Sequence, residues 1–214
     1  MKLGLLKCDP RPFETFYAAW LPDVEWRIYE VHLGQLPASP NECEGWVGTG
    51  SRFSVYDDEP WINAYAALVR EYHKADAPFV GICFGYQMIA HALGGAVGRN
   101  PEGWCVGIHQ CQVHHRREWM SPPLDSFGLV MSCQDHIEAL PPGATQLAAG
   151  MFQIGRMLGL KGHPEYTPEY SASLMELRRE RIGEERVKAG MASLGDPRHP
   201  EELGAWVRNF LAGK

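Results

Sequence analysis

The chain has 214 residues, of which 45% are hydrophobic and 21% are charged, and its net charge is −6. This length predicts a single domain over residues 1–214, with a core that needs no disulfide or metal. Acidic and basic residues are interspersed without a basic block, which argues against nucleic acid or an anionic membrane as the main partner. No apolar segment approaches the length of a bilayer span.

The N-terminus and the cysteines indicate a compartment. Lys7 and Asp9 interrupt an apolar run that is already too short for a signal peptide. The six cysteines are scattered and form no CxxC pair. Free thiols in a chain without a signal predict a cytoplasmic protein.

The first hundred residues alternate strand-like and helix-like patterns. Apolar or alternating runs predict strands, amphipathic spacing predicts helices, and Gly94 and Gly95 stop the last of these helices. The predicted strands are 2–8, 25–32, 45–50 and 77–83, and the predicted helices are 12–20, 59–74 and 84–95. This order predicts an α/β fold with an open, mostly parallel twisted sheet flanked by helices.

From about Ala96 the pattern changes to short strands between turns rich in proline and glycine. They predict a mixed or antiparallel second half of the same domain, with additional antiparallel strands among those at 106–115, 127–133, 145–150, 151–155 and 157–163. The glycines of "GGAVGRN" (94–100) lack the GxGxxG order and predict a helix stop and a turn.

The C-terminal part is predicted to be helical. Thr167 is a suitable N-cap before Pro168, and Tyr170, Leu174 and Leu177 are expected to share one face of the helix. A final helix is predicted over 201–212.

Cys83 lies between two glycines, Gly81 and Gly85, where an apolar strand meets a helical pattern. A sharp strand-to-helix turn leaves little room two positions either side of its apex, which favours glycine at both. The amides at the start of the helix point at the sulfur and favour the reactive thiolate, and the amide of Phe84 is placed to donate to an oxyanion. We therefore interpret Cys83 as a nucleophile, although an isolated cysteine is more often a buried packing residue.

A nucleophilic cysteine requires a base, and the base requires an orienting group. His163 stands at the end of an apolar strand, where an open α/β sheet presents its site. Pro164 fixes the backbone, which allows the carboxylate of Glu165 to turn back to the ring. Without Cys83, a loop histidine bonded to the backbone would be an equally good interpretation.

Three histidines and a cysteine within residues 107–117 raise the question of zinc. On a strand, His109 and Cys111 would face one side and His114 the other, and no second ligand pair follows at zinc-site spacing. We therefore predict no metal site.

Together these segments resemble the class I glutamine amidotransferases, in the branch of the GMP synthetase glutaminase domain and of stand-alone γ-glutamyl peptidase-like proteins. "GICFGYQ" (81–87) is similar to the G-x-C-x-G-x-Q elbow of the family, and "GLKGHPE" (159–165) to its G-x-Q-x-H-P-E segment. "GTGSRFSVYDDEPW" (48–61) resembles the oxyanion loop, and "SCQDHIEALP" (132–141) resembles S-H-x-D-x-V-x-x-L-P. The resemblance covers nearly the whole chain and implies the flavodoxin-like fold of that family.

The resemblance also implies residue roles. Cys83 would attack the γ-amide of glutamine, His163 would act as base and then as acid, and Glu165 would orient His163. The backbone amides implied to form the oxyanion hole are those of Gly50, Ser51 and Phe84. The residues implied to bind the substrate are Gln87, Ser132, Cys133 and Gln134. The resemblance implies no cofactor.

Three features depart from the family pattern. Lys161 replaces a glutamine, Cys133 replaces a common histidine, and the loop 48–51 carries Gly-Thr-Gly-Ser instead of a double glycine. None of these positions belongs to the triad, so the departures concern substrate contacts and the oxyanion donor.

Three functions remain open. The first is hydrolysis of the glutamine γ-amide through a thioester on Cys83, with ammonia passed to a synthetase subunit in trans because the chain is too short to include a synthetase. The second is stand-alone hydrolysis of γ-glutamyl peptides or conjugates, because the segment "GHPEY" (162–166) resembles the relatives that catalyse this reaction. The third is a non-catalytic regulatory or binding module, against which the intact Cys83, His163 and Glu165 weigh.

Overall fold

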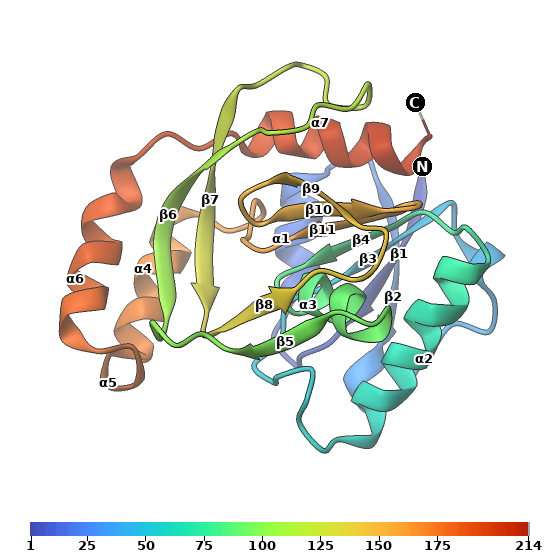
Figure 1. The fold of residues 1–214 in the computed structure, drawn as a ribbon, viewed down its shortest axis with the longest axis horizontal. Coiled ribbons are helices and arrows are strands. Elements are labelled where there is room, and N and C mark those ends of the chain that lie inside the picture. The colour runs from blue at the N-terminus through green and yellow to red at the C-terminus, as the bar shows by residue number, and fades with distance from the viewer. Residues whose placement is uncertain (214) are drawn as a thin grey trace.

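The computed structural model describes residues 1–213, and its centre is a sheet with helices packed on both faces (Figure 1). Seven strands form this sheet in the order β2-β1-β3-β4-β11-β10-β9. The parallel strands are β2 (Glu25–Glu30), β1 (Lys2–Lys7), β3 (Gly45–Gly48), β4 (Phe79–Ile82) and β11 (Met157–Leu160). The antiparallel strands at one edge are β10 (Met151–Ile154) and β9 (Thr145–Ala148). The predicted fold class, a mostly parallel sheet with antiparallel additions, is confirmed.

Alternate residues of the central strands face two separate layers of helices. Val47 and Val80 belong to the core beneath α1 (Phe13–Trp20) and α7 (Pro200–Leu211). Their neighbours Trp46 and Phe79 belong to the core beneath α2 (Pro60–Lys74) and α3 (Phe84–Ala92). Because both faces are covered, these strands are apolar along their whole length rather than at every second residue.

Two further pairs of antiparallel strands lie outside the main sheet (Figure 1). β5 (Ala96–Arg99) pairs with β8 (Asp135–Ala139), and β6 (Cys105–Gln112) pairs with β7 (Ser126–Cys133). The prediction of a turn over 94–100 was therefore wrong for Ala96–Arg99, although α3 does end before Gly94, which has φ +90°. β5 gives a weak local signal because none of its residues is fully buried and its partner strand is distant in the sequence.

The C-terminal segment forms four α-helices. Thr167 caps α4 (Pro168–Leu177) by accepting a 3.2 Å hydrogen bond from the amide of Tyr170, as predicted. The face predicted for α4 was wrong at Leu177, which is 81% exposed where the helix ends. The remaining helices are α5 (Arg179–Ile182), α6 (Glu184–Ala192) and α7, and the short 3-10 turns of the chain are η1 (Val31–Leu33), η2 (Pro40–Glu42) and η3 (Ser193–Gly195).

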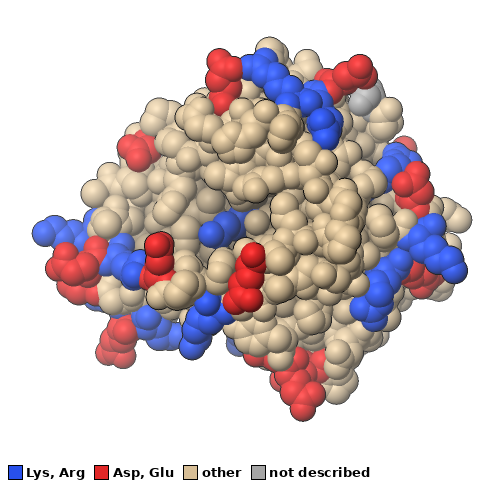
Figure 2. All heavy atoms as spheres, viewed as in Figure 1, with Lys and Arg blue, Asp and Glu red and all other residues tan. Residues whose placement is uncertain are grey.

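The surface carries charge of both signs. Figure 2 shows one face, on which acidic and basic side chains are interspersed and lie mostly toward the periphery. Within residues 1–213, no helix combines the length and the apolar character needed to cross a membrane.

The parallel strands end at a common edge of the sheet. Asp9 follows β1, Thr49 follows β3, Cys83 follows β4, and His163 follows β11. Open α/β sheets bind ligands at the carboxyl ends of their strands. The topology therefore brings together residues that are far apart in the sequence.

Candidate active site

Cys83 occupies the apex of a tight turn between β4 and α3. Its backbone has φ 53° and ψ −97°, a conformation that costs a non-glycine residue on the order of 1–3 kcal/mol. Its amide donates a 2.8 Å hydrogen bond to the carbonyl of Leu160 in β11. The predicted need for flanking glycines holds sterically, because a Cβ on Gly81 would lie 2.4 Å from the carbonyl of Gly85, and one on Gly85 would lie 2.6 Å from the carbonyl oxygen of Gly48.

His163 and Glu165 form a buried pair beside this turn. The Nδ1 atom of His163 lies 2.7 Å from Oε1 of Glu165, and their residues are 3% and 6% exposed. The backbone amide of His163 donates to the carbonyl of Val130 in β7 at 2.8 Å. The Tyr166 ring stacks on the imidazole with a centroid distance of 4.0 Å and an interplanar angle of 2°. The ring orientation is thus fixed by a carboxylate, a neighbouring strand and an aromatic face.

Cys83 and His163 both lie beside Gly50. A Cβ added to Gly50 would lie 2.9 Å from Cε1 of His163 and 3.6 Å from Cβ of Cys83. Gly50 therefore leaves open the space between them. Cys83, which follows β4, and His163, which follows β11, therefore both border the loop after β3 that carries Gly50.

The loop after β3 is held in place by a buried carboxylate that the sequence patterns did not reveal. Asp9 is fully buried, accepts the amide of Arg52 at 3.0 Å, and forms two side-chain hydrogen bonds with Arg11. Burial acts against ionisation, but the hydrogen bonds and charge of Arg11 hold the pKa of Asp9 below its ordinary value. Asp9 thereby anchors the segment that contains Gly50 and Ser51. The Ser51 hydroxyl itself donates to the carbonyl of Cys8 at 2.7 Å.

Phe84 begins α3, and its amide therefore lies in the first turn, where no intrahelical carbonyl accepts it. Its ring packs between Trp61 and Tyr65. The amide of the next residue, Gly85, donates to the carbonyl of Thr49 at 3.2 Å. This bond joins the elbow to the loop that carries Gly50, so that both sets of expected oxyanion donors belong to one connected unit.

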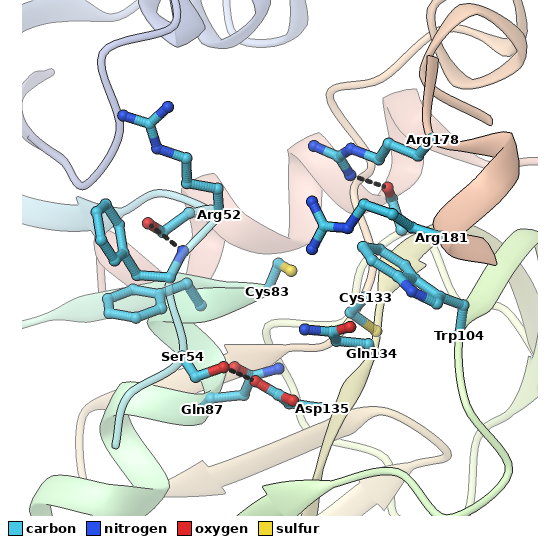
Figure 3. Close-up of a pocket in the computed structure, with 14 residues that line it drawn as sticks. Arg52, Ser54, Cys83, Gln87, Trp104, Cys133, Gln134, Asp135, Arg178 and Arg181 are labelled. Atoms are coloured by element: carbon cyan, nitrogen blue, oxygen red, sulfur yellow. Dashed lines mark hydrogen bonds between the residues drawn. The ribbon is translucent and has the colours of Figure 1, made fainter. Parts of the chain in front are cut away.

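A pocket opens over Cys83 (Figure 3). The residues expected to bind the substrate all line it, namely Gln87, Ser132, Cys133 and Gln134. Gln87 is one turn along α3 and is 4% exposed. The sequence patterns did not single out the other polar side chains of its wall, which are Arg52, Ser54, Asp135, Arg178 and Arg181, nor the aromatic residue Trp104.

The two substituted positions have different surroundings. The thiol of Cys133 interacts with those of Cys105 and Cys83. The interaction with Cys105 lowers the pKa of Cys133. The interaction with Cys83 and the burial of the thiol raise this pKa, and the net result is a pKa of about 12. Cys133 is therefore a neutral thiol at neutral pH. The side chain of Lys161 instead runs beside Gly150, and Lys161 does not line the pocket over Cys83 in the described part of the chain.

Among the described residues, Asp135 is the one carboxylate that lines the pocket. Its two oxygens accept hydrogen bonds from the hydroxyls of Ser54 at 2.5 Å and of Tyr56 at 2.9 Å. Over residues 1–213, no cluster of three or more His, Cys, Asp or Glu side chains is arranged to hold a metal ion.

The family model of the class-I glutamine amidotransferases matches residues 53–169, which is more than half of the chain. The chain belongs to this family. The matched residues include the Cys83 elbow and the His163–Glu165 pair. The family assignment expected from the sequence is thus confirmed, and members of this family are generally hydrolases.

Individual relatives of the amidotransferase family agree with this assignment. γ-Glutamyl peptidase 5 of Arabidopsis thaliana is 27% identical over 222 residues, which covers 94% of this chain and 88% of that protein. The glutamine-hydrolysing GMP synthase of Thermomicrobium roseum is 32% identical over 137 residues, covering 58% of this chain and 24% of the synthase. A glutamine amidotransferase structure from Thermotoga maritima has a TM-score of 0.78 at 18% identity, covering 99% of this chain and 96% of that chain, and this likeness shows the fold.

The close approach at Gly85 generates a test of the elbow. In Gly85→Ala the new methyl group meets the Gly48 carbonyl, and we expect the free energy of unfolding to fall by about 1–3 kcal/mol. Chemical denaturation measures this value. Gly195→Ala is the matched control, because a Cβ there meets nothing within 4 Å, and its stability should stay within about 0.5 kcal/mol of the parent. Equal stability of the two variants would contradict the steric account.

Proposed function

We propose that the chain hydrolyses the γ-amide bond of a γ-glutamyl compound, with Cys83 as nucleophile, His163 as general base and acid, and Glu165 as the residue that orients His163. The observation that carries this proposal is the convergence of a strained elbow cysteine with a buried His–Glu pair hydrogen-bonded at 2.7 Å. Nucleophilic catalysis by cysteine needs these three functions in reach of one another.

The reaction proceeds in two halves. His163 takes the proton of the Cys83 thiol, and the thiolate forms a bond to the γ-carbonyl carbon. The tetrahedral oxyanion accepts hydrogen bonds from the amides of Gly50, Ser51 and Phe84, which stabilise it more than the ground-state carbonyl. The C–N bond then breaks as His163 returns its proton to the leaving nitrogen, and a γ-glutamyl thioester remains on Cys83.

In the second half a water molecule resolves the thioester. His163 removes a proton from the water, the oxygen attacks the thioester carbonyl, and the C–S bond breaks to release glutamate, while His163 returns the proton to the Cys83 sulfur. Throughout, the carboxylate of Glu165 accepts the hydrogen of Nδ1, which holds the tautomer in which Nε2 is the basic nitrogen.

Recognition of the glutamyl group is assigned to the wall beyond Cys83. Gln87 and Gln134 offer amide donors and acceptors, and Asp135 offers a carboxylate that is already oriented by two hydroxyls. Such a mixed set suits the α-ammonium and α-carboxylate of an amino acid, which need an acceptor and a donor respectively.

Glutamine is the simplest substrate of this chemistry, and ammonia is then the leaving group. The likeness to GMP synthase, which covers only a quarter of that enzyme, favours delivery of ammonia to a synthetase subunit in trans. The likeness to γ-glutamyl peptidase 5, which covers nearly the whole chain, favours a stand-alone hydrolase. Turnover of glutamine and of γ-glutamyl peptides by the isolated chain, measured as glutamate release, distinguishes a stand-alone enzyme from one that waits for a partner.

The nucleophile is tested by Cys83→Ala. We expect glutamate release from γ-glutamyl substrates to fall at least about a thousandfold, because the thioester can no longer form. Cys111→Ala is the matched control, since Cys111 is also buried but lies outside the pocket wall, and it should keep near-parental turnover. Unchanged glutamate release in a folded Cys83→Ala protein would show that the assignment is wrong.

The orienting carboxylate is tested by Glu165→Gln, which conserves shape. A glutamine amide is neutral, so it no longer stabilises the imidazolium form of His163, and its NH2 group competes with its oxygen for the position beside Nδ1. We expect kcat to fall by about a hundredfold to ten-thousandfold, with the thermal unfolding midpoint measured alongside. Glu169→Gln, a change of the same kind on the exposed start of α4, should leave kcat unchanged. Equal kcat values for both variants would exclude the role of Glu165.

A further inference from the structure

Two arginines of the C-terminal helices line the pocket without a partner carboxylate. Arg178 joins α4 to α5 and is half-buried, and Arg181 lies in α5 and is exposed. The Arg178 guanidinium donates to the hydroxyl of Ser132 at 3.1 Å. Neither guanidinium has a carboxylate within ion-pairing distance among the described residues.

The arginine between these two does have carboxylate partners. Arg179, between the two, forms ion pairs with Glu176 and Glu184 on the outer surface. Arg11 is paired with Asp9. Carboxylates are therefore present in this segment, but Glu176 and Glu184 form their ion pairs with Arg179, which does not line the pocket.

Trp104 holds the two free cations close together. The guanidinium carbons of Arg178 and Arg181 lie 5.7 Å and 5.6 Å from the centroid of its ring. Stacking on an aromatic face attracts each cation, but two like charges at one ring repel each other. Burial, together with the Arg11 guanidinium, lowers the pKa of Arg178, which is the direction expected for a cation whose charge is not compensated. A bound anion would remove both the repulsion and the uncompensated burial.

The position of the arginines relative to Cys83 indicates which part of a substrate they meet. In Figure 3 Cys83 lies between two groups of side chains, with Arg178, Arg181 and Trp104 on one side and Ser54, Gln87 and Asp135 on the other. When the γ-carbonyl lies over Cys83, the glutamyl group occupies one side and the leaving group the other. The side of Gln87 and Asp135 suits the zwitterionic glutamyl group, as argued above, which leaves the arginines for the leaving group.

The pocket also continues on the side of the arginines. A second hollow shares Trp104, Gln134 and Arg181 with it and adds a further cation, Arg99. Arg52 contributes less to this side, because its guanidinium points away from Cys83 in Figure 3 and lies over the Phe53 ring. Ammonia, the leaving group of glutamine, needs neither this room nor these charges.

We propose that Arg178 and Arg181, held on Trp104, bind the free carboxylate of the leaving group, and that the substrates are therefore γ-glutamyl peptides with a free C-terminal carboxylate rather than glutamine. This inference rests on the proposed function and names its substrate class. The planar, forked guanidinium groups match a carboxylate in geometry as well as charge. The arginines act as specificity determinants, since they touch the leaving group but not the reacting atoms.

A matched pair of substrates tests this inference. γ-Glutamylglycine and γ-glutamylglycinamide differ only in the terminal carboxylate, and glutamine serves as the third compound. For the unmodified protein we expect kcat/KM to be about tenfold to a hundredfold higher for γ-glutamylglycine than for the amide. In Arg181→Gln this preference should shrink at least about fivefold, mainly through a higher KM for γ-glutamylglycine, while kcat/KM for the amide and for glutamine stays unchanged.

Two further variants complete the experiment. Arg179→Gln removes a neighbouring positive charge outside the pocket and should keep the parental preference. Arg178→Lys keeps the charge but loses the fork and should give an intermediate preference. Because Arg181 is exposed, its variant should fold normally, and thermal unfolding checks this.

The outcomes separate this inference from the proposed function. Equal kcat/KM for the acid and the amide in the unmodified protein would overturn the carboxylate site while leaving Cys83 chemistry intact. An equal loss on all three compounds in Arg181→Gln would also overturn it, because the arginine would then serve the glutamyl group. No Cys83-dependent turnover of any of the three compounds would overturn both proposals.

Discussion

The close packing of the β4–α3 turn against β3 and β11 is the constraint on which the rest of the site depends. Cys83 adopts a strained backbone conformation at φ 53°, and such strain persists only when the surroundings enforce it. Here the carbonyl of Leu160 accepts the Cys83 amide and the carbonyl of Thr49 accepts the Gly85 amide. The strands that enforce the turn lead directly into the loop of Gly50 and to His163, so one set of contacts positions all three parts of the proposed machinery.

The pocket over this turn has two chemically different ends. One is a network of hydroxyls and amides around Asp135, and the other is a pair of arginines on Trp104. The first end comes from the loop after β3, from α3 and from β8, whereas the arginines come from the helices after β11. The arginines thus belong to a part of the fold separate from the Cys83 elbow, so under the proposed mechanism the leaving-group side can change without disturbing the elbow.

The sequence predicted the elements whose signal is local. The apolar strands before Cys83 and the Thr167 cap were recognisable from their own residues and neighbours, and the structure agrees with them. The strand β5 was missed because it is half-exposed and acquires its identity only by pairing with β8. Leu177 was misplaced because helical periodicity does not show where a helix ends.

The same reasoning applies to the candidate site. Cys83, His163 and Glu165 lie in short motifs with a chemical rationale, and the sequence predicted them as candidates for that reason. Asp9, Tyr166 and Arg178 have no such motif: their importance comes from contacts with Arg52, with the His163 ring and with Trp104, each far away or unremarkable in the sequence. Trp104 likewise lies in no motif, and only the fold places two guanidinium groups on it.

The most direct test of the central claim is covalent labelling of the unmodified chain with a glutamine-derived electrophile, followed by peptide mapping. The chain has six cysteines, so five thiols act as internal controls, including the more accessible Cys43 and Cys105. The account predicts one adduct per chain on Cys83, slowed by excess γ-glutamyl substrate. A folded protein with no adduct on Cys83, or with labelling that follows thiol exposure alone, would contradict it.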